Sequence, residues 1–178
     1  MKEFERIPDI AIRHLEMVLE AVPEDGTLVE YGCGWSTVWF AEHLHPNQNL
    51  ISVEHDPKWW GEILPHVVNN EQVELLLKPA LADPGPYGSH FRENPTGLSD
   101  YIWGVDHESS DVIFIDGVAR GACFAVSYVQ SEPGTKIFVH DSQRVAWYGW
   151  AYKFANQGSI VIHPPAEGHP SELLECRL

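Results

Sequence analysis

One run of the sequence limits the possible folds most strongly. Residues 112–115 (VIFI) are apolar without interruption, and an acid and a glycine, Asp116 and Gly117, follow directly. A strand that is covered on both faces carries apolar side chains throughout, whereas a strand with one wet face alternates apolar and polar residues. The run therefore predicts a central strand of a parallel sheet with helices on both of its faces.

Further strands and helices alternate along the chain on either side of this run. Short apolar segments at 27–31, 50–54, 73–77 and 136–140 predict strands. Helices are expected over about 8–21, 36–45, 119–129 and 145–157, and from residue 57, where the pair Asp56 and Pro57 is typical of a helix start. This alternation predicts an α/β fold: a Rossmann-like, doubly wound and mostly parallel sheet.

The remaining segments predict a closing hairpin and one long loop. Residues 159–163 and 173–178 are expected to form an antiparallel C-terminal hairpin across the loop 164–171. Residues 79–107 are rich in proline and glycine, so an irregular loop is expected there, and such long loops are usually functional or mobile. The length of 178 residues suits a single domain, residues 1–178.

The composition narrows the classes of partner. The chain has 26 acidic and 11 basic residues, and its formal net charge of −15 argues against nucleic acid, because phosphate binding needs clustered lysine and arginine. A small-molecule substrate fits better. No apolar run is long enough to cross a membrane and the N-terminus lacks a secretory signal, so a cytoplasmic location is expected. The three cysteines lack zinc-site spacing and are expected to be reduced.

The strongest local motif is the glycine loop after the first strand, within residues 28–37 (LVEYGCGWST). Gly32 and Gly34 let the backbone turn tightly and approach a ligand that a Cβ atom would block. The helix that follows points its free N–H groups into the same space. A dinucleotide fingerprint needs glycine or alanine at its third position, where this chain has Thr37. The loop therefore predicts a nucleotide-type cofactor, and Thr37 disfavours a nicotinamide.

The spacing Glu30-x-Gly32-x-Gly34-x-Ser36 resembles the first motif of the class I S-adenosylmethionine-dependent methyltransferases, with Ser36 in place of the third glycine of that family. The resemblance implies that Glu30 lies near the methionine end of the cofactor. Cys33 lies between the two glycines, where contacts of the backbone matter most. These five residues are therefore candidate cofactor-binding residues.

The second predicted strand ends in Glu54, twenty-two residues after Gly32, and His55 follows it. An acid at this place can accept hydrogen bonds from both ribose hydroxyls, and the resemblance implies the same role. The alternative is a solvated acid at a strand end. Glu54 and His55 complete the candidate cofactor site.

Acids also end the next two strands of the predicted sheet, Asp116 after one and Asp141 after the other. Asp116 is expected beside both the cofactor and the substrate. Within the family, cation-dependent O-methyltransferases carry acids at both places, which implies a Mg²⁺ site here that would lower the pKa of a substrate hydroxyl. This chain departs from that pattern, because Gly117 and Val118 replace a further acid. The alternative is that Asp116 caps a helix and Asp141 pairs with Arg144.

Other polar residues at these strand ends suggest catalytic roles. His140 is a candidate general base, because imidazole titrates near neutral pH, with a structural hydrogen bond as the alternative. Arg120 is interpreted as a ligand for a substrate or cofactor carboxylate, or as part of a salt bridge. Trp35 and Trp103 are candidates for stacking on a planar group. Asp116, Arg120, His140 and Asp141 also follow a pattern found in a small set of uncharacterised methyltransferase-like proteins.

These observations lead to three hypotheses. The first is an enzyme that moves a methyl group from S-adenosyl-L-methionine to an oxygen or nitrogen of a small-molecule acceptor, with Asp116, His140 and Asp141 as catalytic residues. The second is an NAD-dependent oxidoreductase, and the third is a binding protein that keeps the methyltransferase fold without turnover. The sequence does not identify the acceptor or the oligomeric state.

Overall fold

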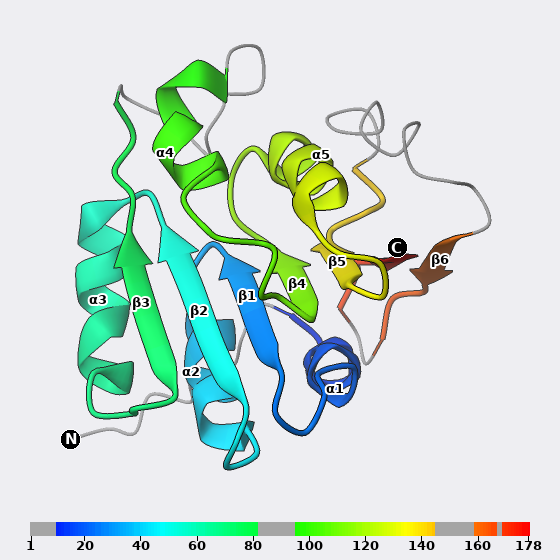
Figure 1. Cartoon of the computed structure of the whole chain (residues 1–178), viewed down its shortest axis with the longest axis horizontal. Helices are drawn as coiled ribbons and strands as arrows, with labels where there is room; N and C mark the ends of the chain where they lie inside the picture. The colour runs from blue at the N-terminus through cyan, green and yellow to red at the C-terminus, as the bar shows by residue number, and fades with distance from the viewer. Residues whose placement is uncertain (1–9, 82–94, 145–158, 167–168) are drawn as a thin grey trace.

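The computed structural model describes residues 10–81, 95–144, 159–166 and 169–178. Seven strands there form one sheet in the order β3-β2-β1-β4-β5-β7-β6 (Figure 1). The strands are Thr27–Tyr31 (β1), Asn49–Glu54 (β2), Val73–Leu77 (β3), Val112–Ile115 (β4), Lys136–His140 (β5), Ile160–His163 (β6) and Leu173–Arg177 (β7). The helices are Ile12–Glu20 (α1), Trp35–His43 (α2), Pro57–Val67 (α3), Ser99–Ile102 (α4) and Arg120–Gln130 (α5).

The predicted sheet is confirmed in both its parallel and its antiparallel part. Strands β3, β2, β1, β4 and β5 pair in parallel, whereas β7 is antiparallel to β5 and to β6. The last strand of the chain is thus inserted between β5 and β6. The four side chains of β4 are fully buried, as the uninterrupted apolar run predicted.

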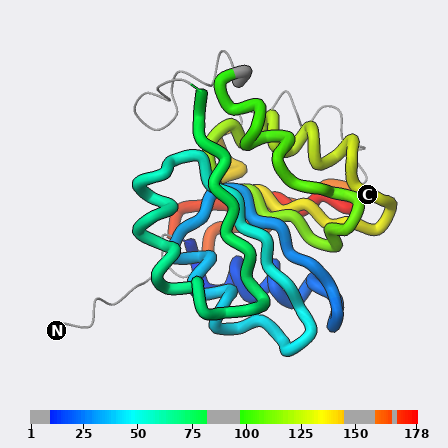
Figure 2. Tube along the Cα trace, turned by 60° about the vertical axis from the view of Figure 1, so that its left-hand side comes forward, coloured from blue at the N-terminus to red at the C-terminus, as the bar shows by residue number. Residues whose placement is uncertain are grey.

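Helices cover both faces of the sheet because successive residues of its central strands point to opposite sides. Tyr31 packs with Phe124 of α5 in one core cluster, whereas Leu28 packs with Leu15 of α1 and Phe40 of α2 in another. Figure 2 shows the same division, with α1 and α5 on opposite sides of the sheet. The polar residues at the carboxyl ends of β1, β2, β4 and β5 therefore share one edge between the two helical layers.

The prediction of an irregular segment at 79–107 is wrong for its second part. A 3₁₀ turn, Pro95–Leu98, leads directly into α4. The buried side chains of Leu98, Tyr101 and Ile102 explain this, because they pack on the sheet in the same core as β1 and β4. The helix expected at 145–157 lies outside the described residues.

Two smaller expectations concern the thiols and the membrane. All three cysteines are free and buried, as expected from their number and spacing. Over the described ranges, we find no helix with the length and apolar character needed to cross a membrane.

Candidate cofactor and active site

Gly32 forms the turn that leads from β1 into the glycine loop. Its φ angle of 94° lies in the left-handed region that favours glycine. A Cβ atom at this position would lie 2.4 Å from the Cα atom of Gly117, which follows β4. The predicted tight turn is confirmed, but the backbone that approaches Gly32 most closely is that of Gly117. Gly32 therefore lies where the chain after β1 and the chain after β4 come into backbone contact.

Gly34 lies in a different environment. Its backbone is extended, with a φ angle of −175°, so its conformation does not require glycine. A Cβ atom here would meet only ordinary neighbours, the Ser36 hydroxyl at 3.8 Å and the Trp59 indole nitrogen at 4.0 Å. No described protein atom thus excludes a side chain at Gly34. The space in front of this residue is available to a ligand.

Glu30 lies beneath the glycine loop and has no exposed surface. One carboxylate oxygen accepts a hydrogen bond from the Ser36 hydroxyl at 2.6 Å, and the other accepts from the hydroxyls of Ser52 and Thr37. Thr37 Oγ1 in turn accepts from the backbone N–H of Gly34 at 2.8 Å. Glu30 therefore holds the loop and the start of α2 from below. Its direct contact with a cofactor stays a prediction.

The Glu30 environment predicts a pH dependence of stability. Burial raises the pKa of Glu30 to about 7, although the hydrogen bonds from Ser36, Ser52 and Thr37 oppose this rise. The folded chain then keeps a proton that the unfolded chain has released, so this group lowers the free energy of unfolding as the pH rises from about 4.5 to about 7. Urea unfolding at about pH 5 and at about pH 8 gives the change in the free energy of unfolding of each protein. Between these two pH values, wild type should lose roughly 2–3 kcal/mol more of this free energy than Glu30→Gln. Equal losses in the two proteins would contradict this assignment.

Cys33 is a core residue as well as a loop residue. Its thiol packs with Val38 of α2 and Ile63 of α3, and burial raises the pKa of this thiol far above its usual range. The Cys33 carbonyl accepts a hydrogen bond from the Trp59 indole N–H at 2.6 Å. No local pattern of the sequence predicts this contact of Trp59, which is 26 residues from Cys33 and lies on α3. The indole fixes the outer side of the glycine loop.

Glu54 ends β2 and is almost fully buried. Its Oε1 atom accepts hydrogen bonds from the backbone N–H groups of His55 and Asp56, both at 2.8 Å. The His55 ring nitrogen Nδ1 lies 2.6 Å from the same oxygen. The structure thus brings Glu54 and His55 together at the strand end next to the glycine loop. The contact of Glu54 with a ribose stays a prediction.

Asp116 and His140 form a pair across the ends of β4 and β5. The Nδ1 atom of His140 lies 2.7 Å from Oδ1 of Asp116. A carboxylate beside Nδ1 favours the tautomer that carries its proton there, which leaves Nε2 as the basic nitrogen. Nε2 is buried and has no hydrogen-bond partner among the described residues. The role of His140 as a general base stays a prediction.

Arg120, at the start of α5, links the same two strand ends. Its guanidinium donates to the backbone carbonyls of Asp116, Gly117 and His140 at 2.6–2.9 Å. It also contacts the carboxylates of Asp116 at 2.9 Å and Asp141 at 3.1 Å. The structural salt bridge, one of the two alternatives for Arg120, is thus present.

Asp141 is held on several sides. Its Oδ1 atom accepts from the Ser171 hydroxyl at 2.6 Å, and its Oδ2 atom lies 2.8 Å from Arg144. Burial by itself raises the pKa of Asp141, but the hydrogen bond from Ser171 and the cationic Arg120 and Arg144 lower it below its ordinary value. Its φ angle of 59° is uncommon for a residue other than glycine. The predicted pairing of Asp141 with Arg144 is present.

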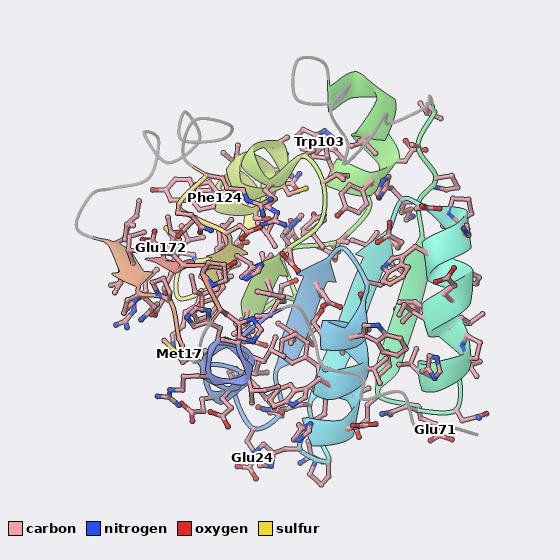
Figure 3. All side chains as sticks on the ribbon, turned by 180° about the vertical axis from the view of Figure 1, so that it is seen from behind. Met17, Glu24, Glu71, Trp103, Phe124 and Glu172 are labelled. Atoms are coloured by element: carbon pink, nitrogen blue, oxygen red, sulfur yellow. The ribbon has the colours of Figure 1, made fainter. Side chains whose placement is uncertain are left out.

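The two candidate stacking residues lie in different surroundings, Trp35 directly after Gly34 at the start of α2 and Trp103 at the end of α4. Trp35 packs on the His66 ring of α3, with 5.2 Å between ring centroids. Trp103 follows α4 and is 59% exposed (Figure 3). The remaining predicted residues gather along one edge of the sheet.

The predicted Mg²⁺ site can be tested against the donor set. Asp116 and Asp141 do approach a common point, but the Arg120 guanidinium occupies it. Among the described residues, no three histidine, cysteine, aspartate or glutamate side chains are placed to hold a metal ion. The arrangement of the described side chains therefore does not fit Mg²⁺.

Fold and site together define a class: an α/β protein with a glycine loop after β1 and polar residues at the ends of β2, β4 and β5. Comparison with known proteins gives the family. A family model described as a methyltransferase domain matches residues 29–142, which is more than half of the chain. The chain belongs to this methyltransferase-domain family, so the prediction of a methyltransferase is confirmed. A search of curated protein sequences found no match.

Solved structures share the fold at low sequence identity. A methyltransferase-like protein from Silicibacter pomeroyi is 22% identical, with a TM-score of 0.63 over 98% of this chain and 88% of that one. An O-methyltransferase from Streptomyces achromogenes, involved in tomaymycin synthesis and solved with S-adenosylmethionine, is 16% identical, with a TM-score of 0.65 over 96% and 83%. An rRNA methylase from Streptococcus thermophilus is 13% identical, with a TM-score of 0.59 over 93% of each chain. These similarities confirm the predicted Rossmann-like fold.

Proposed function

We propose that the chain transfers a methyl group from S-adenosylmethionine to an oxygen or nitrogen of a small-molecule acceptor. The observation that carries the cofactor assignment is the space in front of Gly34, where neither backbone conformation nor a neighbouring atom requires glycine. A ligand lying against the backbone would give a physical reason for glycine at this position, because a Cβ atom would take up part of the ligand's space. The O-methyltransferase from Streptomyces achromogenes, which has the same fold, was solved with this cofactor.

The residues around the loop suit this cofactor. Helix α2 begins directly after Gly34, so the positive end of its dipole lies beside this residue, and Glu54 places a carboxylate at the end of the adjacent strand. Glu30 and Trp59 hold the loop from below and from outside. In this proposal Gly32, Cys33 and Ser36 shape the loop, and Glu54 and His55 lie toward the ribose.

His140 is the proposed general base. The cofactor supplies an electrophilic methyl carbon, and as the acceptor atom bonds to it the carbon–sulfur bond breaks and S-adenosylhomocysteine leaves. The acceptor loses one proton in this exchange, and the unpartnered Nε2 atom of His140 takes it. Asp116 stabilises the imidazolium that results, because its carboxylate already lies against Nδ1. Asp141 keeps Arg120 in place behind this pair.

The choice of a small-molecule acceptor rests on charge. An RNA acceptor, as for the rRNA methylase with the same fold, calls for a basic surface. This chain has a net charge of −15, and its Arg120 is used within the protein. A neutral or cationic acceptor with a hydroxyl or amine is therefore favoured over a polyanion.

Calorimetric titration with S-adenosylmethionine tests the cofactor assignment. Wild type should bind it at micromolar concentration and should not bind NAD. Gly34→Ala should weaken binding at least tenfold, because its Cβ occupies the ligand space, while the thermal midpoint stays within about 2 °C of wild type. Absence of binding to wild type at millimolar S-adenosylmethionine would overturn the proposal.

The acceptor class needs a separate measurement. The protein is incubated with methyl-labelled S-adenosylmethionine and pools of phenols, alcohols, amines and carboxylic acids, and in parallel with ribosomal RNA. Label in a small-molecule pool alone is the expected result. Label in RNA would contradict the acceptor class but not the cofactor. Cofactor binding without label in any pool would favour the non-catalytic alternative.

A further inference from the structure

The guanidinium of Arg120 makes its contacts within the protein. An arginine side chain has five N–H groups. Here Nε donates to the Gly117 carbonyl, NH1 to the His140 carbonyl and to Asp141, and NH2 to the Asp116 carbonyl. NH2 also lies 2.9 Å from Oδ1 of Asp116, so all three nitrogen atoms contact groups of the protein. The group is also largely enclosed, with 14% of the side chain exposed.

The two carboxylates on this guanidinium come from the strand ends where cation-dependent O-methyltransferases are expected to carry their acids. Asp116 follows β4 and Asp141 follows β5, and these strands are neighbours in the sheet. Two carboxylates that converge with little solvent repel each other unless a cation lies between them. In this chain that cation is a side chain.

We propose that Arg120 takes the place of a divalent cation between Asp116 and Asp141, so that the chain binds no Mg²⁺ there and works without a metal. The inference concerns the same strand ends as the proposed function and deepens it. A metal ion can bind the acceptor oxygen and lower the pKa of its hydroxyl. A guanidinium whose three nitrogen atoms contact the protein in this way cannot do so. Removal of the acceptor proton is then left to His140, and Arg120 is a positioning residue.

The sequence offers an explanation of how this arrangement arises. Gly117 and Val118 stand where the cation-dependent subgroup has a further acid, so one oxygen ligand for a metal is missing. Two residues later, Arg120 begins α5 after Ala119, whose φ angle of 51° turns the chain toward the strand ends. Gly117 and Val118 thus supply no oxygen ligand, and Arg120 supplies the positive charge.

Titration with Mn²⁺, a probe for oxygen-ligand cation sites, tests the inference without measuring methyl transfer. Wild type should show no stoichiometric Mn²⁺ binding by calorimetry or electron paramagnetic resonance. Arg120→Ala leaves the two carboxylates without their cation, so it should bind one Mn²⁺ at least thirtyfold more tightly than wild type. About 10 mM Mg²⁺ should raise the thermal midpoint of this variant alone, by about 5 °C. The double variant Arg120→Ala with Asp141→Asn should show neither the tighter Mn²⁺ binding nor the rise of the thermal midpoint with Mg²⁺.

Arg13→Ala is the matched control. Arg13 also lies between two carboxylates, those of Glu16 and Glu20, but on the exposed side of α1. Its removal should create no cation site. Stoichiometric Mn²⁺ binding to wild type that Asp141→Asn removes would overturn the inference, and so would a folded Arg120→Ala that gains no Mn²⁺ affinity. If Arg120→Ala does not fold, Arg120→Lys replaces it: this variant keeps a cation and should resemble wild type in the titration, and Mn²⁺ binding by it would count against the inference.

Discussion

Gly32→Ala is expected to lower the free energy of unfolding by about 3 kcal/mol or more, one of the two largest effects that we predict. Two causes act together. The φ angle of 94° is strained for any residue with a Cβ atom, and that Cβ atom would lie 2.4 Å from the Cα atom of Gly117. Neither backbone can give way easily, because β1 and β4 are paired in the sheet. Urea unfolding measured by circular dichroism gives the difference directly.

Gly61→Ala serves as the control for this experiment. Gly61 lies inside α3, and a Cβ atom there would meet no atom within 4 Å. Because alanine favours the helix, this variant should be as stable as wild type or more stable by up to about 1 kcal/mol. A small effect of Gly32→Ala, equal to that of the control, would show that the two strand ends are not in close contact.

His140→Asn is expected to lower the rate of methyl transfer by about 10²- to 10⁴-fold, the usual contribution of a general base. The asparagine amide can still donate to Asp116 in place of Nδ1–H, but it has no basic nitrogen in place of Nε2. The affinity for S-adenosylmethionine should change little, because the proposed cofactor residues lie on β1, β2 and the loop after β1. Initial rates are measured with the acceptor identified in the labelling experiment, and affinity by calorimetry.

The pH profile separates a base from a structural residue. His140→Asn should lose the part of the pH dependence of kcat/KM that a general base contributes in wild type. His45→Asn is the control, since this exposed histidine precedes β2 at the opposite end of the sheet and should leave rate and profile unchanged. A His140→Asn variant with wild-type kcat/KM would exclude the base role.

Much of the sheet could be predicted from local patterns. The bounds of β1, β3 and β5 agree with the predicted segments, because each of these strands is a short and mainly apolar segment of the sequence. The start of α3 was equally clear, since Asp56 accepts from the N–H group of Lys58 just as an N-cap residue does. Helix α4 could not be predicted in this way. Its four residues are helical because Tyr101 and Ile102 pack on the sheet, and short helices depend on such packing.

The candidate site also has features that local patterns predict and features that only the tertiary structure decides. The sequence by itself determined which residue types stand at the strand ends, because the apolar runs locate those ends: Glu30, Gly32, Glu54, Asp116 and His140. Only the tertiary structure decided what each of them contacts. Gly32 meets Gly117 after a separation of 85 residues, and Arg120 bridges acids that precede and follow it on different strands. Such contacts depend on the order and register of the strands in the sheet. No local pattern of residues predicts that order or that register.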